Sequence, residues 1–172
     1  MSPEVSTKQL QFGEEQIALL EKLCNASAVS GVEKEVRVIV QEALDGIADE
    51  VIVDTLGNLL VTRKARQKNA LRVMLAAHMD EVGFILTSDE KDGLFRFETV
   101  GGIDVRQLVG KAVLVGEKNI PGVIGTTPIH LLENNELERK VPLSSLRIDM
   151  GPGGADKAKA GDRAVFATRF KQ

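Results

Sequence analysis

The chain has 172 residues, of which 43% are hydrophobic, and its 22 basic and 25 acidic residues give a formal net charge of −3. The basic residues are scattered and the aromatic residues are six phenylalanines, so neither a cationic nucleic-acid surface nor a base-stacking platform is indicated. The N-terminus lacks a signal-peptide pattern, and no apolar run approaches the ~20 residues of a membrane span. We therefore expect a soluble cytoplasmic protein without nucleic-acid or membrane partners.

Two amphipathic helices are predicted near the N-terminus. The first covers Glu14–Asn25, and the helical period places its apolar residues on one face. Cys24, the single cysteine, falls on that face and is predicted to be a buried small hydrophobe. A second helix is predicted between Ser30 and Gly46, because Ser30 and Glu33 have the spacing of a capping box and an apolar stripe follows them.

The next two segments have the pattern of strands. The run "EVIVDTLGNLLVTRK", residues 50–64, alternates around the turn dipeptide Gly57-Asn58, which predicts a β-hairpin. The run "LRVMLAA", residues 71–77, is a compact apolar stretch of strand length. Such a stretch is typical of a strand buried on both faces of an α/β sheet.

Beyond residue 80 the pattern changes to short apolar segments separated by Gly, Pro, Asn and Asp, with no long helical period. Several short strands with frequent turn signals are typical of a small β-barrel or sandwich. We therefore predict an α/β region over residues 1–80 and a barrel over residues 81–172.

The stretch "LAAHMDEVG" carries the candidate chemistry. Residues two apart on a strand point to the same side, so His78 and Asp80 can face one site, with the carboxylate near the imidazole. A carboxylate beside a ligating histidine is a common arrangement at metal sites, although a chance surface pair has the same spacing. Glu81 is open to a role as ligand, base or surface residue. His130, the other histidine, is predicted to be structural.

Six stretches resemble, in order, the M42 family of metallo-aminopeptidases, the glutamyl-aminopeptidase or TET-like group. They are "LLEKLCNASAVSGVEKEVR", "VDTLGNLLVTRK", "VMLAAHMDEVGF", "FRFETVGGID", "GVIGTTPIHLL" and "LRIDMG", and they cover most of the chain between residues 14 and 170. The resemblance implies the N-terminal part of a zinc-peptidase-like α/β catalytic domain, followed by a barrel that mediates dimerisation. It also implies that His78 is a metal ligand and that Asp80 is a catalytic residue that orients its imidazole.

The resemblance further implies two divalent metal ions, zinc or cobalt, peptide substrates and a homo-oligomer, either a dimer or a larger assembly. Family members are considerably longer, and an Asp-Asp motif, a Glu-Glu pair and further Asp and His ligands belong after the position of Gln172. We therefore expect weak or no metal binding in this truncated chain, and no peptidase activity by the chain alone. The alternative is a non-catalytic fragment that acts in assembly through its barrel.

Overall fold

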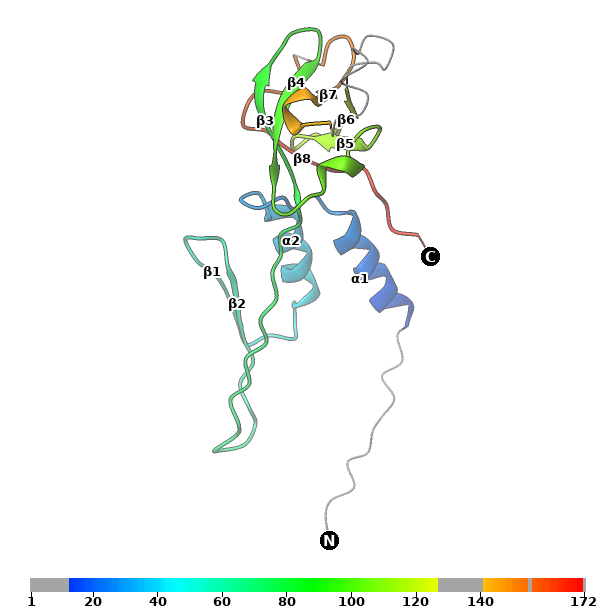
Figure 1. The fold of residues 1–172 in the computed structure, drawn as a ribbon. Coiled ribbons are helices and arrows are strands. Elements are labelled where there is room, and N and C mark those ends of the chain that lie inside the picture. Colours follow the sequence, from blue (N-terminus) through cyan, green and yellow to red (C-terminus); the bar gives the residue numbers. More distant parts are fainter. Residues whose placement is uncertain (1–12, 127–140, 155, 172) are drawn as a thin grey trace.

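The computed structural model of the protein describes residues 13–126, 141–154 and 156–171. Figure 1 shows a closed barrel at one end and, at the other, two helices beside a two-stranded hairpin. The helices and strands are, in chain order, α1 (Glu14–Asn25), α2 (Lys34–Ala43), β1 (Glu50–Val53), β2 (Leu59–Thr62), β3 (Gly83–Asp89), β4 (Leu94–Val100), β5 (Ala112–Val115), β6 (Ile120–Gly125), β7 (Arg147–Asp149) and β8 (Arg163–Phe166). Among the described residues, no helix is long and apolar enough to cross a membrane.

The barrel closes in the order β3-β4-β7-β6-β5-β8, and β8 returns to pair with β3. All its strand pairs are antiparallel. The predicted α/β protein with a small barrel after the histidine motif is therefore confirmed. Closure matters because it leaves no strand edge of the barrel unpaired along its circumference.

The barrel is filled by side chains from alternate positions of its strands. In β4, Phe95 and Phe97 are buried while their neighbours Leu94, Arg96 and Glu98 are exposed, as the pleat of a strand requires. Across the interior the Phe84 ring meets those of Phe97 and Phe166 edge to face, with centroid distances of 5.2 and 5.0 Å. The remaining buried residues of this core are Leu86, Leu108, Val113, Val115, Ile124, Leu146, Ile148 and Ala164.

The predicted hairpin is confirmed, and its turn is built by Asp54. β1 and β2 pair antiparallel, with Ile52 opposite Leu60. The Asp54 carboxylate accepts from the N–H groups of Leu56 and Asn58 and from the Asn58 side chain at 2.8–2.9 Å. These bonds lower the pKa of Asp54, with the Asn58 side-chain bond as the largest cause.

The helix α1 has the predicted bounds, but its predicted buried cysteine is exposed. Leu23 reaches a small apolar cluster formed by Ala26, Ala28 and Val36. The next residue, Cys24, is turned about 100° around the helix axis, away from that cluster. The prediction of a buried Cys24 is wrong because the apolar face of α1 is covered only in part by the described residues.

The second helix begins at Lys34, later than the capping-box pattern predicts. Glu33 stands at its N-cap without a side-chain capping bond. Glu33 instead accepts from the Gly31 N–H, and the Ser30 hydroxyl donates to Asp80, fifty residues away in sequence. The predicted capping box is therefore wrong because both side chains have other partners.

The run predicted to be a buried strand, residues 71–77, forms neither strand nor helix, and it is exposed. A strand of a two-sided sheet needs neighbours that accept and donate main-chain hydrogen bonds and layers that cover its faces. Within the described residues, the barrel strands pair with one another, and β1 pairs with β2. The prediction of a buried strand at residues 71–77 is wrong because the described residues provide no neighbouring strand for it.

Segment 25–30 joins the helical region to the barrel. Ser27 Oγ donates to Asn119 Oδ1 at 2.9 Å, and Arg163 Nε donates to the Ser30 carbonyl at 3.4 Å. Asn25 accepts from the Arg169 side chain and from the Phe170 N–H at 3.0 and 2.9 Å. The chain that leaves β8 is thus tied to the end of α1.

Substitution of Gly83 by Ala should destabilise this joint. The added Cβ would lie 2.5 Å from Val29 Cγ2 and 2.6 Å from the Ala164 carbonyl oxygen, so a packed side chain and the β8 backbone would both have to move. We expect a loss of about 1–3 kcal/mol in the free energy of unfolding, measured by urea denaturation. Gly102→Ala, whose Cβ meets nothing within 4 Å, is the matched control. Equal stability of the two variants would contradict the close contact.

Candidate metal site around His78 and Asp80

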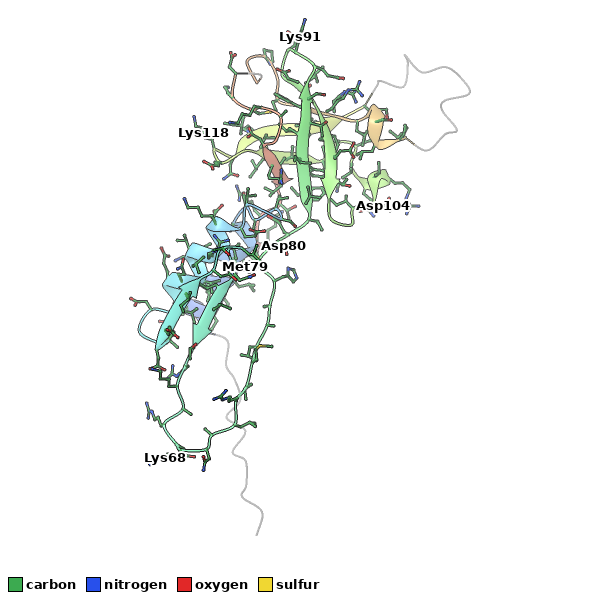
Figure 2. All side chains as sticks on the ribbon, turned by 90° about the vertical axis from the view of Figure 1, so that its left-hand side faces the viewer. Lys68, Met79, Asp80, Lys91, Asp104 and Lys118 are labelled. Carbon is green, nitrogen blue, oxygen red and sulfur yellow. The ribbon has the colours of Figure 1, made fainter. Side chains whose placement is uncertain are left out.

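Residues 80–81 are held in place by segment 25–30. Val29 and Glu81 form an isolated parallel bridge, in which the Glu81 N–H donates to the Ala28 carbonyl at 2.8 Å. The Ala28 N–H donates in return to Glu81 Oε1 at 3.2 Å. Val29 is fully buried, so packed side chains support this contact. In Figure 2 the labelled Met79 and Asp80 lie at the junction between the helices and the barrel.

The His78 imidazole lies against Asp80, as the His-x-Asp spacing predicts. His78 Nδ1 is 2.9 Å from the Asp80 carbonyl oxygen and 3.2 Å from Asp80 Oδ1. Both partners are acceptors, so this geometry favours the tautomer with the proton on Nδ1. The side chain of His78 is 85% exposed, which leaves its other nitrogen, Nε2, accessible as a ligand atom. A metal-ligand role for His78 stays a prediction.

Asp80 is oriented from its other side by Ser30. Ser30 Oγ donates to Asp80 Oδ2 at 2.5 Å. This hydrogen bond is the main reason why the pKa of Asp80 lies below its ordinary value, and the neighbouring His78 contributes in the same direction against a partial opposing effect of burial. Asp80 is therefore ionised at neutral pH. An ionised Asp80 can accept a hydrogen bond from Nδ1–H of His78 and hold the ring in one orientation.

Glu81 differs from Asp80 in its electrostatic environment. Desolvation raises its pKa, and the negative charge of Glu35 adds to the rise, while the bond from the Ala28 N–H opposes it. The residue as a whole keeps an exposed surface, but its carboxylate reaches toward the packed segment 25–30. Because its folded-state pKa is raised, Glu81 contributes to stability below its ordinary pKa, and this contribution is lost as pH rises through the folded value.

His78, Asp80 and Glu81 are among the residues that line an open groove of about 740 Å³. Most of the other lining residues are apolar, among them Val36 from α2 and Met79 from the histidine motif. The other lining residues are Leu23, Cys24, Ala26, Ala28, Val40, Asn58, Leu59, Ala77 and Thr168. The groove thus combines apolar side chains with an imidazole and two carboxylates in its lining.

The donor set among the described residues falls short of the needs of a catalytic metal. Within the part of the chain that the structure describes, no group of three or more His, Cys, Asp or Glu residues could hold a metal ion. His78 and Asp80 fit the roles of one ligand and its orienting partner, whereas a catalytic zinc generally takes three protein ligands. His130 lies outside the described residues. Sequence reasoning missed Ser30, whose only local signal was the capping-box pattern.

Comparison with known proteins identifies relatives of this chain. Residues 57–172 match the family described as M42 glutamyl aminopeptidase, which confirms the resemblance seen in the sequence. The lysyl aminopeptidase of Pyrococcus furiosus is 33% identical over 163 residues, which cover 88% of this chain and 46% of that protein.

Solved structures agree with the sequence comparison. A TET aminopeptidase from a marine sediment Thaumarchaeota archaeon superimposes with a TM-score of 0.85 at 33% identity, covering 92% of this chain and 46% of that one. The TET1 peptidase of Pyrococcus horikoshii, described as able to assemble into a tetrahedron or a large octahedral shell, gives a TM-score of 0.76 at 34% identity, covering 90% and 47%. The chain spans about half the length of these relatives.

Removal of the Ser30 hydroxyl should raise the pKa of Asp80. In Ser30→Ala we expect the carboxylate to titrate closer to its ordinary value of about 3.9, measured by carboxyl-carbon NMR. The depressed pKa stabilises the fold above the unfolded-state pKa, and this contribution is lost as pH falls through the folded-state pKa. The variant should therefore lose less stability in acid. Ser27→Ala, which removes a hydroxyl bonded to Asn119, is the control. An unchanged Asp80 titration in Ser30→Ala would rule out this orienting bond.

Proposed function

Because this chain belongs to the M42 glutamyl aminopeptidase family, we propose that it supplies a metal ligand, His78, and the carboxylate that orients it, Asp80, to a metal-dependent aminopeptidase. The proposed substrates are peptides, from which N-terminal residues are removed. The observation that supports this function is the hydrogen-bonded series from Ser30 through Asp80 to His78, whose last two members line an open groove.

Each member of the series has a defined task in the proposed site. Ser30 holds one oxygen of Asp80, so the other oxygen can face the imidazole of His78. Asp80 then accepts a hydrogen bond from Nδ1–H, which fixes the ring and increases the basicity of Nε2. Nε2 would be the atom that holds the metal. When bound, a divalent metal supplies a Lewis acid for the peptide carbonyl and lowers the pKa of water.

The proposed metals are two divalent ions, zinc or cobalt. A single imidazole with its orienting carboxylate provides only a fraction of the free energy with which a multi-ligand site holds a metal. We therefore propose that the 172-residue chain binds such ions weakly. The residues that the structure describes bring no group of three or more metal-ligating side chains together, so the chain should not turn over peptides by itself.

The proposed division of labour follows the architecture. Residues 1–80 would belong to the catalytic region, which carries His78 and Asp80, and residues 81–172 would form the barrel. The barrel would associate with other copies to give a homo-oligomer, which is supported by the assembly described for the Pyrococcus horikoshii relative. A non-catalytic role in assembly is the second candidate function, and the closed barrel is the observation that favours it.

The metal-ligand role of His78 predicts a specific NMR response. On titration with Zn²⁺, we expect weak binding that shifts the Nε2 resonance of His78 and leaves Nδ1 protonated, measured by long-range nitrogen-proton correlation spectra. Asp80→Asn should weaken this binding by about 10–100-fold. His78→Ala should abolish the response, whereas His130→Ala, which removes the other histidine, should preserve it. A response that survives His78→Ala would assign the metal elsewhere.

Peptidase activity is tested with the purified chain and aminoacyl-anilide substrates in the presence of Zn²⁺ or Co²⁺. We expect no turnover above that of the metal alone, because one imidazole cannot assemble the reacting groups. Robust turnover that is lost in His78→Ala would show that the chain is a complete peptidase, contrary to this proposal. Turnover that is unaffected by His78→Ala would instead indicate a contaminating enzyme.

A further inference from the structure

Ser30 lies in a tight turn whose type decides the direction of its carbonyl group. Residues 29–32 form this turn, in which the Val32 N–H donates to the Val29 carbonyl at 2.9 Å. Gly31, the third residue, has a φ of 92°, which is typical of a type II turn and is rarely adopted by residues with a side chain. The central peptide group of a type II turn is rotated by roughly half a turn compared with type I. The direction of the Ser30 carbonyl therefore distinguishes the two turn types.

The central peptide group of this turn, between Ser30 and Gly31, is held from both sides. The Ser30 carbonyl accepts from Arg163 Nε at 3.4 Å, and the Gly31 N–H donates to Glu33 Oε1 at 2.5 Å. The guanidinium also lies beside Gly31, since a Cβ built there would be 3.7 Å from Arg163 Nη2. One contact comes from the barrel and the other from the N-cap of α2, so both regions favour the same orientation of the peptide group.

Arg163 is itself fixed by the barrel. It lies on β8, which pairs with β3 and β5, and its carbonyl accepts from the Gly116 N–H at 2.8 Å. The next residue, Ala164, is buried in the barrel core, so the pleat of the strand directs the Arg163 side chain outward. Arg163 Nη1 donates to the Gly161 carbonyl at 3.1 Å, which orients the guanidinium. The barrel thus presents a well-held donor to the Ser30 carbonyl.

We propose that Arg163 is a positioning residue for the candidate metal site and that it acts through Ser30. Its hydrogen bond keeps the main chain of Ser30 in the orientation from which Ser30 Oγ reaches Asp80 Oδ2 at 2.5 Å. Asp80 in turn lies against the imidazole of His78. The series of contacts therefore begins on the barrel and ends at the candidate metal ligand. The inference rests on the proposed function for the role of His78, whereas the link between Arg163 and Ser30 is independent of it.

Arg169 provides a matched control for this role. Its Nη1 donates to the Asn25 carbonyl at 3.0 Å, so it too joins the chain around β8 to the helical region through a main-chain acceptor. That bond ends at Asn25 and not in the turn of residues 29–32. Loss of the Arg169 bond should loosen the attachment of the barrel without releasing Ser30.

The first test measures the side-chain rotamer of Ser30 in metal-free protein from vicinal NMR coupling constants. In Arg163→Met, which keeps a long side chain but removes its donors, we expect Ser30 to populate several rotamers, whereas one should dominate in the unaltered chain. Arg163→Lys, which keeps a donor, should restore part of this preference. Gly31→Ala, which disfavours the positive φ, should release Ser30 by a second route that leaves Arg163 in place. Arg169→Met should leave the Ser30 rotamer unchanged.

The second test measures the affinity of His78 for Zn²⁺ by NMR titration. Arg163→Met should weaken binding by about threefold to tenfold, which is less than the roughly 10–100-fold effect of losing a direct partner of a ligand. In a Ser30→Ala background the same substitution should cause no further loss, because an effect transmitted through the Ser30 hydroxyl disappears with it. Circular dichroism should confirm that the variants are folded.

Three results would overturn the inference. The first is an unchanged Ser30 rotamer in folded Arg163→Met. The second is an equal effect of Arg163→Met and Arg169→Met, which would indicate a general loosening of the joint. The third is a loss of Zn²⁺ affinity that persists in the Ser30→Ala background, because Arg163 would then act by its charge. Absence of Zn²⁺ binding at His78 in the unaltered chain would contradict the proposed function alone, since the rotamer test needs no metal.

Discussion

The contact between segment 25–30 and residues 80–81 is the constraint on which the rest of the structure depends. The main-chain bridge pairs only Val29 with Glu81, yet it fixes where the chain enters β3. Gly83 follows two residues after Glu81, with no room for a side chain beside Val29. The same segment supplies the Ser30 hydroxyl to Asp80. A single stretch between two helices therefore sets both the attachment of the barrel and the orientation of the candidate site.

Local pattern predicted the parts of the fold whose partners are near in sequence. The hairpin followed from alternation around Gly57-Asn58, and the barrel followed from frequent turns between short apolar runs, because antiparallel neighbours are often consecutive. Residues 71–77 show where this reasoning fails. Their composition suits a buried strand, but burial depends on distant neighbours that no local pattern reveals. The capping-box prediction for Ser30 failed for a related reason, since its hydroxyl bonds to Asp80, fifty residues away, and not to the start of the helix.

The pairing of His78 with Asp80 was predictable from the sequence, whereas the contacts that orient Asp80 were not. The two-residue spacing of His78 and Asp80 suffices to bring a carboxylate to an imidazole, and the structure places them 3.2 Å apart. Neither Ser30 nor the opposite pKa shifts of Asp80 and Glu81 could be derived from spacing. Those shifts arise because one carboxylate accepts a hydroxyl hydrogen bond while the other is desolvated near Glu35. Adjacent acidic residues can thus have different protonation behaviour when a single neighbouring segment contacts them differently.

The closed barrel also has a consequence for local unfolding of the chain. Its strands hold one another through a continuous ring of main-chain bonds around a packed interior, so local fluctuations cannot fray it from an edge. Amide protons there should exchange with solvent only through cooperative opening of the whole ring. The amides of residues 71–77 have no such protection and should exchange at rates close to those of an unfolded chain. Among the described residues, the barrel strands and residues 71–77 should therefore differ most in hydrogen exchange.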